Sequence, residues 1–433
     1  MYDLAIIGAG WAGFNACIRA KELNLKVALI EKAEIGGTCL NLGCIPTKAL
    51  IHSAKIFNLA KESSDFGVES VSPTLNFVKV TERKNRIIDN LRSGMRFMLK
   101  GVDLFNAEAK IISPCQVDIG GKIIETKSIL LATGSSPLKL DQYKFDGKKI
   151  ISSNEAISLR KIPSSLLIIG GGVIGCEFAS LFSAFGTEVT IIEKMPRLLW
   201  GEDSDITGRL EASFRKKGIK INTGANRFDV SNGVNQDSFD FILVSVGRAP
   251  HGDIPGLGKI GVKLEKGRVI TDNFLKTNID NIYAAGDCTG GVMLAHFAGY
   301  QGRLAAENIS GKIGLKKKNS SGIPNCIFTD PEVASVGLTQ EKAVKEGIDV
   351  EVKKFDFMGL GAARILNEPQ GLLKIVSDKK DNAVLGASII GPKATEIIGI
   401  LTLAVSCRLR VEDLRSAIFA HPTISEAISE ALR

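Results

Sequence analysis

The residues most able to do chemistry in this chain are two cysteines, Cys39 and Cys44, which stand five positions apart. In a regular helix this spacing puts the Cα atoms about 8–9 Å apart, whereas a disulfide needs Cα atoms within roughly 7 Å. If the two cysteines bond, the chain between them must depart from helical geometry, which Gly43 and Pro46 permit. A strained, accessible disulfide is easily reduced, which favours a catalytic role. The alternative is two buried thiols in a helical segment.

A histidine near the end of the chain is a candidate base. The chain has 4 histidines, and His421 precedes Pro422 and stands five positions before Glu426. Since the thiolate attacks a disulfide, a dithiol substrate must lose a proton, and histidine suits this near pH 7. Glu426 could orient the imidazole and stabilise its charged form. We also expect a cis peptide bond before Pro422. The alternative is an ordinary core or surface histidine.

A glycine-rich turn near the start of the chain predicts a dinucleotide site. Gly8, Gly10 and Gly13 form G-x-G-x-x-G between a predicted strand at 2–7 and a predicted helix that runs to about residue 24. Such glycines let the backbone approach a pyrophosphate, which the helix N-terminus then binds. Glu31 ends a second predicted strand at 25–30 and can accept hydrogen bonds from ribose hydroxyls.

The same pattern returns later in the chain. Gly170, Gly172 and Gly175 follow a predicted strand at 165–169, and Glu193 closes another at 187–192. Two such sites suggest two dinucleotides that exchange electrons. A carboxylate at Glu193 favours a free 2′-hydroxyl and therefore NAD over NADP, although Arg197, four residues on, could weaken that preference. The alternative for either turn is a glycine-rich β–α connection without a ligand.

The elements that must position these residues follow from the apolar pattern. Residues 50–100 are predicted to be helical and 104–131 to form short strands that end before Thr133, Gly134 and Ser135. Similar strands end at Gly247 and at Gly286–Asp287. Beyond residue 322 the pattern changes to α+β, with the following predicted segments: strands at 326–328, 334–337, 372–376 and 384–390, and helices at about 339–346, 393–407 and 424–432.

Composition limits the possible functions. A chain of 433 residues, 44% hydrophobic and 24% charged, suits two or three globular domains. The net charge of +8 is modest, so nucleic-acid binding is not expected. The 8 cysteines fit neither a secreted disulfide framework nor a metal site. A strand pattern from Tyr2 and short apolar runs predict neither a signal peptide nor a membrane span, so we expect a cytoplasmic protein.

The cysteine segment, Gly-Gly-Thr-Cys-Leu-Asn-Leu-Gly-Cys-Ile-Pro-Thr-Lys at 36–48, resembles the redox-active disulfide of the class I pyridine nucleotide–disulfide oxidoreductases. The resemblance runs in order from residue 2 almost to residue 433. It is closest to the dihydrolipoamide dehydrogenase branch, the E3 components of 2-oxoacid dehydrogenase complexes. The phrases that carry this closer likeness are residues 43–48, 175–180 and 421–426.

The resemblance implies an α/β protein with two Rossmann-like dinucleotide-binding domains and a C-terminal α+β dimerisation domain. The expected FAD-binding domain is discontinuous, at 1–145 and 265–315, the NAD-binding domain spans 146–264, and the dimerisation domain spans 322–433. The implied reaction oxidises dihydrolipoamide with FAD and NAD as cofactors. The implied partners are a second copy of the chain and the lipoyl domains of a 2-oxoacid dehydrogenase or glycine cleavage complex.

The resemblance also assigns roles to residues. Cys39 exchanges with substrate, Cys44 faces the flavin, and His421, oriented by Glu426, serves the partner subunit. Lys48 lies near the flavin ring, with Glu177 as its partner. The remaining expected cofactor-binding residues are Gly8, Gly10, Gly13, Glu31, Gly37, Thr38, Thr133, Gly134, Ser135, Gly170, Gly172, Gly175, Glu193, Gly247, Gly286, Asp287, Met293, Leu294, Ala295 and His296.

Two alternatives stay open at this point. Another disulfide or small-molecule reductase of the same family would run in the opposite direction with NAD(P)H. A structural component of a 2-oxoacid dehydrogenase complex is a possibility from another class, against which the intact Cys39/Cys44 and His421/Glu426 pairs argue.

The short region between Ile219 and Phe241 also suggests that a hairpin of the NAD-binding domain is trimmed.

Overall fold

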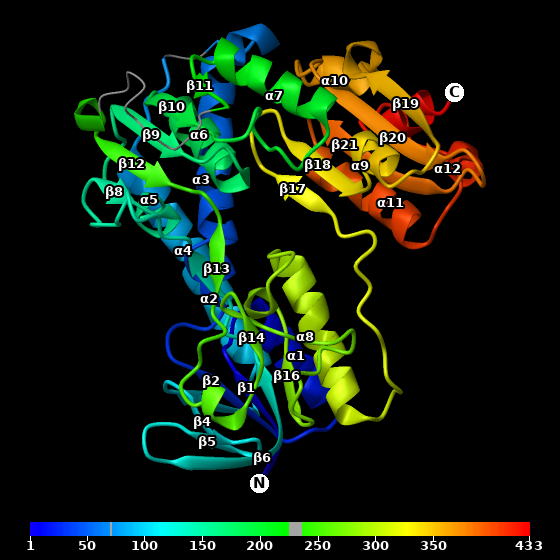
Figure 1. Cartoon of the computed structure of the whole chain (residues 1–433). Coiled ribbons are helices and arrows are strands. Elements are labelled where there is room, and N and C mark those ends of the chain that lie inside the picture. The colour runs from blue at the N-terminus through cyan, green and yellow to red at the C-terminus, as the bar shows by residue number, and fades with distance from the viewer. Residues whose placement is uncertain (70–71, 225–235) are drawn as a thin grey trace. The chain divides into compact units, whose positions relative to one another are not determined.

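The computed structural model describes residues 1–69, 72–224 and 236–433. The described residues form two compact units. The first unit comprises Met1–Leu50, Val78–Leu140 and Gly247–Asn319, and the second comprises Ile51–Phe77, Asp141–Val246 and Ser320–Arg433. Helix α3 (Cys44–Lys61) contributes residues to both. Sheets and helices alternate along the chain, which confirms the predicted α/β class (Figure 1).

The first unit is built on a sheet whose central strands are parallel. Strands β3, β2, β1 and β6 are neighbours in that order, β5 and β4 continue antiparallel from the start of β6, and β16 pairs with the end of β6. The strand bounds are β1 (Tyr2–Ile7), β2 (Val27–Glu31), β3 (Asp103–Asn106), β4 (Lys110–Ser113), β5 (Gln116–Asp118), β6 (Ile123–Leu131) and β16 (Ile282–Ala284). Strands β1, β2 and β6 each contain a buried aliphatic run, at 4–7, 27–30 and 129–131, as expected where both faces of a sheet are covered.

Helices α1 (Trp11–Glu22) and α8 (Ala295–Ser310) lie side by side in this unit (Figure 1). Their contact is close, since a side chain at Gly302 would overlap the carbonyl oxygen of Ala12. Small residues such as Ala16 and Ala305 fill the core between them. The other elements of the unit are α2 (Gly37–Asn41), α4 (Phe77–Met98), and the strand pairs β7 (Ser135–Pro137) with β13 (Arg248–Pro250) and β14 (Leu264–Glu265) with β15 (Arg268–Val269).

The chain returns to the first sheet late in the sequence. Strand β16 lies parallel to β6, with Ala284 opposite Leu131. Residues 247–264, which were predicted to be part of the NAD-binding domain, belong to the first unit, where Ile254 packs in one core with Ile111. The functional domains, with their predicted bounds, stay a prediction.

A parallel sheet in the second unit carries the second glycine turn. Its described strands follow the order β11-β10-β9-β12-β8. The strands are β8 (Ile150–Ile151), β9 (Ser165–Ile169), β10 (Glu188–Ile192), β11 (Lys220–Asn222) and β12 (Phe241–Val244), and the helices are α5 (Ser153–Ala156), α6 (Val173–Ala184) and α7 (Ser204–Lys216). The hairpin trimming predicted between Ile219 and Phe241 falls largely on residues 225–235, outside the described residues.

An antiparallel sheet follows in the same unit, in the order β17-β18-β21-β20-β19, which agrees with the predicted α+β pattern. Its strands are β17 (Asn325–Ile327), β18 (Val333–Gly337), β19 (Val350–Asp356), β20 (Leu372–Asp378) and β21 (Val384–Ile390). Its helices are α9 (Gln340–Lys345), α10 (Gly361–Ile365), α11 (Ala394–Ser406), α12 (Val411–Ser416) and α13 (Glu426–Ala431). Strand β19 and helices α10 and α12 were not predicted.

Candidate active site

The chain breaks its helical course between the two cysteines. Cys39 lies in α2, which ends at Asn41, and α3 begins at Cys44. Leu42 between them has φ −136°, outside helical geometry. A side chain at Gly43 would stand 2.9 Å from the carbonyl oxygen of Thr38 and 3.4 Å from the Cα atom of Cys39. The backbone at Gly43 therefore folds back onto the Cys39 turn, and the predicted departure from a regular helix is confirmed.

Cys39 and Cys44 are thiols joined by a hydrogen bond. That hydrogen bond is the main reason why the pKa of Cys39 is raised, and burial and the negative charge of a Cys44 thiolate add to it. The positive charge of Lys48 acts in the opposite direction. The two sulfurs are thus close enough to act as one redox pair with Lys48 nearby, while their disulfide stays a prediction.

An arginine that was not predicted from the sequence completes the surroundings of this pair. Arg248 donates from Nε to the Ser135 hydroxyl and from Nη2 to the Ser135 carbonyl oxygen, both at 2.7 Å. Ser135 in turn donates to Asp287 at 2.5 Å. Burial lowers the pKa of Arg248, against which the charges of Asp287 and Cys44 act. One feature of the sequence pointed to Arg248: it directly follows Gly247, which is an expected cofactor-binding residue.

The predicted phrases at 133–135, 247 and 286–287 lie together in the first unit. Thr133 donates a hydrogen bond to the carbonyl oxygen of His251, and Leu138 N–H donates to the carbonyl oxygen of Gly247 at 3.0 Å. Gln301 of α8, buried and also missed, accepts from Gly286 N–H at 2.7 Å. Helix α8 begins at Ala295 with Leu294 as its N-cap, two residues later than the predicted start at Met293, so that His296 lies in its first turn.

The first glycine turn has a shape imposed by the protein's own backbone. Gly8 has φ +103°, and a side chain there would overlap the carbonyl oxygen of Ala132. A side chain at Gly13 would overlap the carbonyl oxygen of Gly8. At Gly10, by contrast, a Cβ would only reach ordinary contact with the Cα atom of Gly37, at 3.8 Å. The middle glycine therefore leaves room above the N-terminus of α1 for a ligand.

The second glycine turn repeats this arrangement. Gly170 has φ +105°, and a Cβ there would stand 2.7 Å from the carbonyl oxygen of Ser245. A side chain at Gly175 would overlap the carbonyl oxygen of Gly170. Apart from Gly172 itself and its two chain neighbours, no atom of the described residues lies within 4 Å of a Cβ placed there. Both turns thus have the close backbone packing and the open middle position that a dinucleotide pyrophosphate requires.

Each glycine turn is also held by hydrogen bonds to the acid predicted for it. Glu31 accepts from the N–H groups of Ala9 at 2.7 Å and Ala33 at 2.8 Å. Glu193 accepts from Gly171 N–H at 2.6 Å and Met195 N–H at 2.7 Å. Since each carboxylate oxygen has a further lone pair, these contacts are compatible with the predicted acceptance from ribose hydroxyls, which stays a prediction.

Glu177 lies in α6 and is 3% exposed. Its carboxylate accepts from the backbone N–H of Phe328 at 3.0 Å. The neighbouring turn of the helix makes a similar contact, because the hydroxyl of Ser180 accepts from Asp330 N–H at 3.0 Å. Glu177 therefore fixes the segment after β17 to the helix of the second glycine turn. Its predicted pairing with Lys48 stays a prediction.

The histidine and carboxylate predicted as a base pair are in contact. His421 Nδ1 lies 2.8 Å from Glu426 Oε1, and Glu426 Oε2 accepts from Thr423 N–H at 2.8 Å. The Thr423 N–H, followed by His421, lowers the pKa of Glu426. The side chain of His421 is 79% exposed. The predicted cis peptide bond between His421 and Pro422 is confirmed. An imidazole held at Nδ1 presents Nε2 outward as a proton acceptor.

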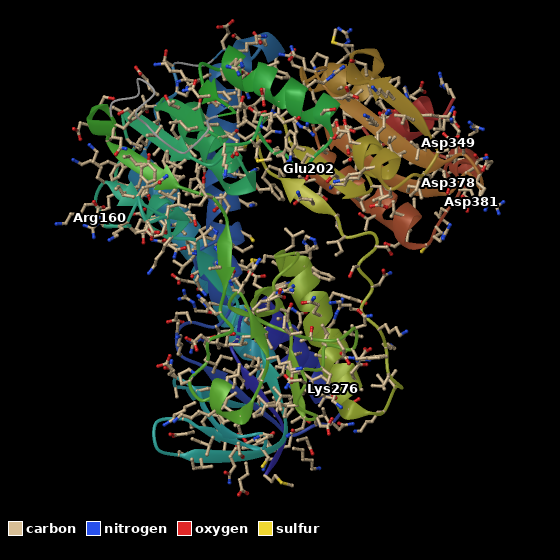
Figure 2. The ribbon with its side chains drawn as sticks, in the orientation of Figure 1. Arg160, Glu202, Lys276, Asp349, Asp378 and Asp381 are labelled. Carbon is tan, nitrogen blue, oxygen red and sulfur yellow. The ribbon has the colours of Figure 1, made fainter. Side chains whose placement is uncertain are left out.

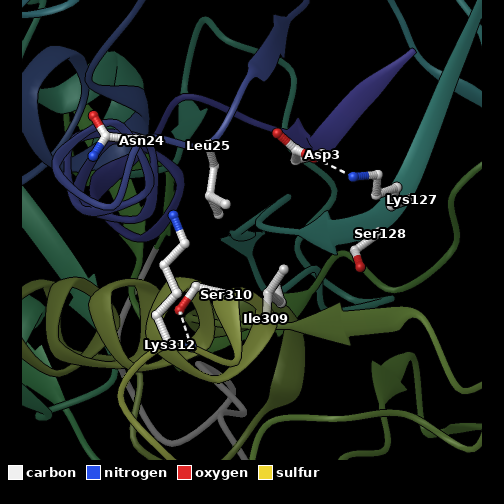
Figure 3. Close-up of a pocket in the computed structure, with 8 residues that line it drawn as sticks. All are labelled: Asp3, Asn24, Leu25, Lys127, Ser128, Ile309, Ser310 and Lys312. Atoms are coloured by element: carbon white, nitrogen blue, oxygen red, sulfur yellow. Dashed lines mark hydrogen bonds and ion pairs between the residues drawn. The ribbon is translucent and has the colours of Figure 1, made fainter.

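A cavity of about 380 Å³ lies elsewhere in the first unit (Figure 3). It is lined by residues at the start of β1, in the middle of β6 and near the ends of α1 and α8: Asp3, Asn24, Leu25, Lys127, Ser128, Ile309, Ser310 and Lys312. Lys127 pairs with Asp3 at 2.7 Å, and Lys312 donates to the carbonyl oxygen of Leu23. The glycine turn follows the carboxyl end of β1, whereas Asp3 of the cavity lies near the amino end of that strand. The cavity is therefore away from the glycine turn and contains no predicted site residue.

Comparison with known proteins identifies the family. A model described as pyridine nucleotide-disulphide oxidoreductase matches residues 2–302, and the dimerisation-domain model of the same family matches residues 323–432. The chain therefore belongs to the pyridine nucleotide–disulphide oxidoreductase family. The match to the dimerisation domain supports a homodimer.

Individual relatives cover nearly the whole chain. A dihydrolipoyl dehydrogenase of Bacillus subtilis is 37% identical over 460 residues, covering 99% of this chain and 97% of its own. One from Chlamydia muridarum is 38% identical, with 99% and 96% coverage. Among solved structures, the HOCl-induced flavoprotein disulfide reductase RclA from Escherichia coli is 29% identical with a TM-score of 0.87, covering 100% and 99%. LpdA from Mycobacterium tuberculosis is 25% identical with a TM-score of 0.90, covering 99% of each chain.

These matches confirm the predicted family, a flavoprotein disulfide oxidoreductase that uses FAD and NAD(H). The two glycine turns described above fit those two dinucleotides. Across 1–69, 72–224 and 236–433, no helix has both the length and the apolar character needed to cross a membrane. The predicted cytoplasmic location stays a prediction.

Proposed function

We propose that this chain oxidises dihydrolipoyl groups to lipoyl groups and reduces NAD⁺, with Cys39 and Cys44 as the redox pair. The observation that carries the proposal is the hydrogen bond between the two thiols, at a break between helices and next to the charge of Lys48. The likeness to dihydrolipoyl dehydrogenases at 37–38% identity supports this class of substrate.

In the proposed reaction, His421 accepts a proton at Nε2 from one substrate thiol while its Nδ1 side is held by Glu426. The substrate thiolate attacks Sγ of Cys39 in the oxidised pair, and the disulfide breaks with Cys44 as the leaving sulfur. The second substrate sulfur attacks the substrate sulfur bonded to Cys39, the bond to Cys39 breaks, and the proton of the second thiol passes to the departing sulfur of Cys39. This step releases the cyclic disulfide product and leaves both cysteines reduced by two electrons in total.

We assign the two cofactors to the two glycine turns. Gly8, Gly10, Gly13 and Glu31, with Gly37, Thr38 and the residues around Ser135 and Asp287, would hold FAD. Gly170, Gly172, Gly175, Glu193 and Glu177 would hold NAD. When bound, FAD and NAD⁺ supply the redox chemistry that removes the electron pair from the dithiol as a hydride equivalent. Lys48 stabilises negative charge beside the dithiol.

The proposed active form is a homodimer in which His421 serves the cysteine pair of the partner subunit. The high exposure of His421, held in place by Glu426, supports this arrangement, because an exposed base is available to a second chain. Lipoyl domains of a 2-oxoacid dehydrogenase or glycine cleavage complex are the proposed protein substrates.

A second candidate is a disulfide or small-molecule reductase that consumes NAD(P)H. The structural likeness to RclA, with a TM-score of 0.87 at 29% identity, favours it. The same cysteine pair would then receive electrons from the nucleotide and pass them to an external acceptor.

Steady-state rates separate these functions. We expect turnover of dihydrolipoamide with NAD⁺ and little turnover of glutathione disulfide with NADPH. C39S and C44S should each lower lipoamide turnover about a thousandfold or more, because neither can complete disulfide exchange. C115S, at an exposed cysteine, is the matched control. Absence of lipoamide turnover in the wild type would refute the proposal, and full turnover by C44S would favour a structural role.

A further inference from the structure

The segment after Glu193 packs directly on the second glycine turn. Leu199 N–H donates to the carbonyl oxygen of Gly171 at 2.9 Å. Leu198 fills the space beside Gly171, where an added side chain would overlap it. Arg197 therefore stands next to the residue that covers the turn and four positions after the acid. This is the region where an arginine would meet a 2′-phosphate on the adenosine ribose.

The guanidinium of Arg197 is already engaged. Its Nη2 lies 3.0 Å from Glu341 Oε2 and donates to the carbonyl oxygen of Glu202 at 3.2 Å. The guanidinium carbon lies 4.4 Å from the ring centre of Trp200. Its Nε is buried and, within the described part of the chain, has no hydrogen-bond partner. The arginine is thus held by one carboxylate, one carbonyl oxygen and one aromatic face.

The carboxylate that pairs with Arg197 belongs to the family's dimerisation domain. Glu341 lies in α9, within residues 323–432. The same domain holds the segment at two more points, since Asn325 donates to the Glu202 carboxylate at 2.7 Å and Lys342 donates to the carbonyl oxygen of Gly201 at 3.0 Å. Figure 2 shows Glu202 beside β17. The position of Arg197 is therefore set from outside the nucleotide-binding sheet.

The charges around Arg197 determine whether a 2′-phosphate can bind there. A phosphate carries about two negative charges near neutral pH, and arginine is well suited to bind it with two parallel hydrogen bonds. The Glu341 carboxylate occupies one of these donors, Nη2, and offsets the positive charge of the guanidinium. The Glu193 carboxylate, fixed at the turn, adds further negative charge.

We propose that Glu341 is a specificity-determining residue which, by pairing with Arg197, keeps that arginine from a 2′-phosphate and so enforces NAD over NADP. The inference rests on the proposed placement of NAD at the second glycine turn. It adds a residue from the dimerisation domain to the selectivity that Glu193 supplies.

The variant E341Q tests the proposal, because it removes the charge and keeps the size. The Glu341 side chain is 45% exposed, so its ion pair contributes little to folding. We expect E341Q to bind 2′,5′-ADP about tenfold more tightly than the wild type, through a freed charge-assisted contact. Binding of 5′-AMP, which lacks the 2′-phosphate, should not change.

Two further variants isolate the cause. E346Q removes an equal charge from an exposed position directly after α9 and should leave both affinities at the wild-type values. R197Q combined with E341Q should lose the gain in 2′,5′-ADP affinity, since the gain requires the arginine. Titration calorimetry on the FAD-loaded dimer gives these affinities without lipoamide turnover.

Oxidation of NADPH and NADH with ferricyanide as acceptor gives a second readout. The ratio of kcat/KM for NADPH to that for NADH should rise about tenfold in E341Q. An unchanged 2′,5′-ADP affinity in E341Q, or the same gain in the double variant, would overturn the proposal. If the wild type binds neither adenine nucleotide, the placement of NAD at the second turn is wrong and this inference falls with it. Failure of lipoamide turnover alone would leave the inference standing.

Discussion

The two glycine turns, at 8–13 and 170–175, share a backbone geometry and differ in what lies on them. In both, the first glycine has φ above +100° and faces a carbonyl oxygen from a neighbouring strand end. In both, the third glycine lies against the carbonyl oxygen of the first. In both, the backbone N–H of the turn's second residue donates to an acid that stands 22 positions further along the chain.

The difference lies in the segment that covers each turn. A Cβ at Gly37, the first residue of α2, would stand 2.7 Å from the Cα atom of Gly10, so the helix that carries Cys39 packs on the first turn. On the second turn the covering residue is Leu198, over Gly171, and the space at Gly172 is open among the described residues. The same geometry therefore carries the proposed redox segment in one unit and the proposed selectivity segment in the other.

The largest expected effect comes from the third glycine of each turn. G13A and G175A would each push a methyl group into the carbonyl oxygen of the turn's first glycine, and neither backbone segment can move without disrupting its strand. We expect a loss of about 3 kcal/mol or more in the free energy of unfolding, measured by urea denaturation. G94A, in α4 where the added methyl has open space among the described residues, is the control. If G13A or G175A unfolded at the wild-type urea midpoint, the close packing inferred for the third glycine of that turn would be wrong.

The middle glycines should separate ligand binding from stability. G172A adds a methyl group to open space, so the free energy of unfolding should change by no more than about 1 kcal/mol, as for alanine at an N-cap. The affinity for NADH should fall about tenfold or more, since the methyl occupies the room left for the pyrophosphate. G10A should likewise lower the retained FAD, read from flavin absorbance. If G172A bound NADH normally, the pyrophosphate would not lie on this turn.

The smallest effect concerns the buried thiols under the two turns. Burial raises the pKa of Cys17, in α1, to about 12, and that of Cys176, in α6, well above its usual value. The unfolded chain loses these protons from about pH 9 while the folded chain keeps them, so stability must fall as the pH rises above 9. Between pH 8 and pH 10, the free energy of unfolding of C17A should fall by about 1 kcal/mol less than that of the wild type. Urea denaturation at both pH values measures the difference, with C115S, at an exposed thiol, as control. Equal pH dependence in C17A and the wild type would contradict this account.

The sequence predicted the parts of this molecule that depend on local patterns. Strands β1 and β9 begin and end at the predicted residues, because each ends in an apolar run that a glycine turn closes. Cys39, Cys44, His421 and Glu426 were identified from spacing and resemblance, and both pairs are in contact.

What the sequence could not predict depends on residues distant along the chain. Strand β19 was missed because Lys353 and Lys354 interrupt its apolar alternation, and its pairing with β20 stabilises it instead. Arg248 was missed because its contact with Ser135 arises where β13 pairs with β7, more than a hundred residues apart in sequence. Glu341 likewise meets Arg197 only in three dimensions.

The pairing of β16 with β6 also sets an order of events on the ribosome. Strand β6 ends at Leu131, but its parallel neighbour β16 begins at Ile282 and the helix that packs on α1 begins at Ala295. At roughly 5–20 residues per second, the intervening chain takes on the order of ten seconds to synthesise. Throughout that interval the apolar surface of α1 is without its partner helix. The strands of the parallel sheet that carries the second glycine turn, β8 to β12, emerge consecutively. The sheet of the first unit therefore stays incomplete for longer during synthesis than the parallel sheet that carries the second glycine turn.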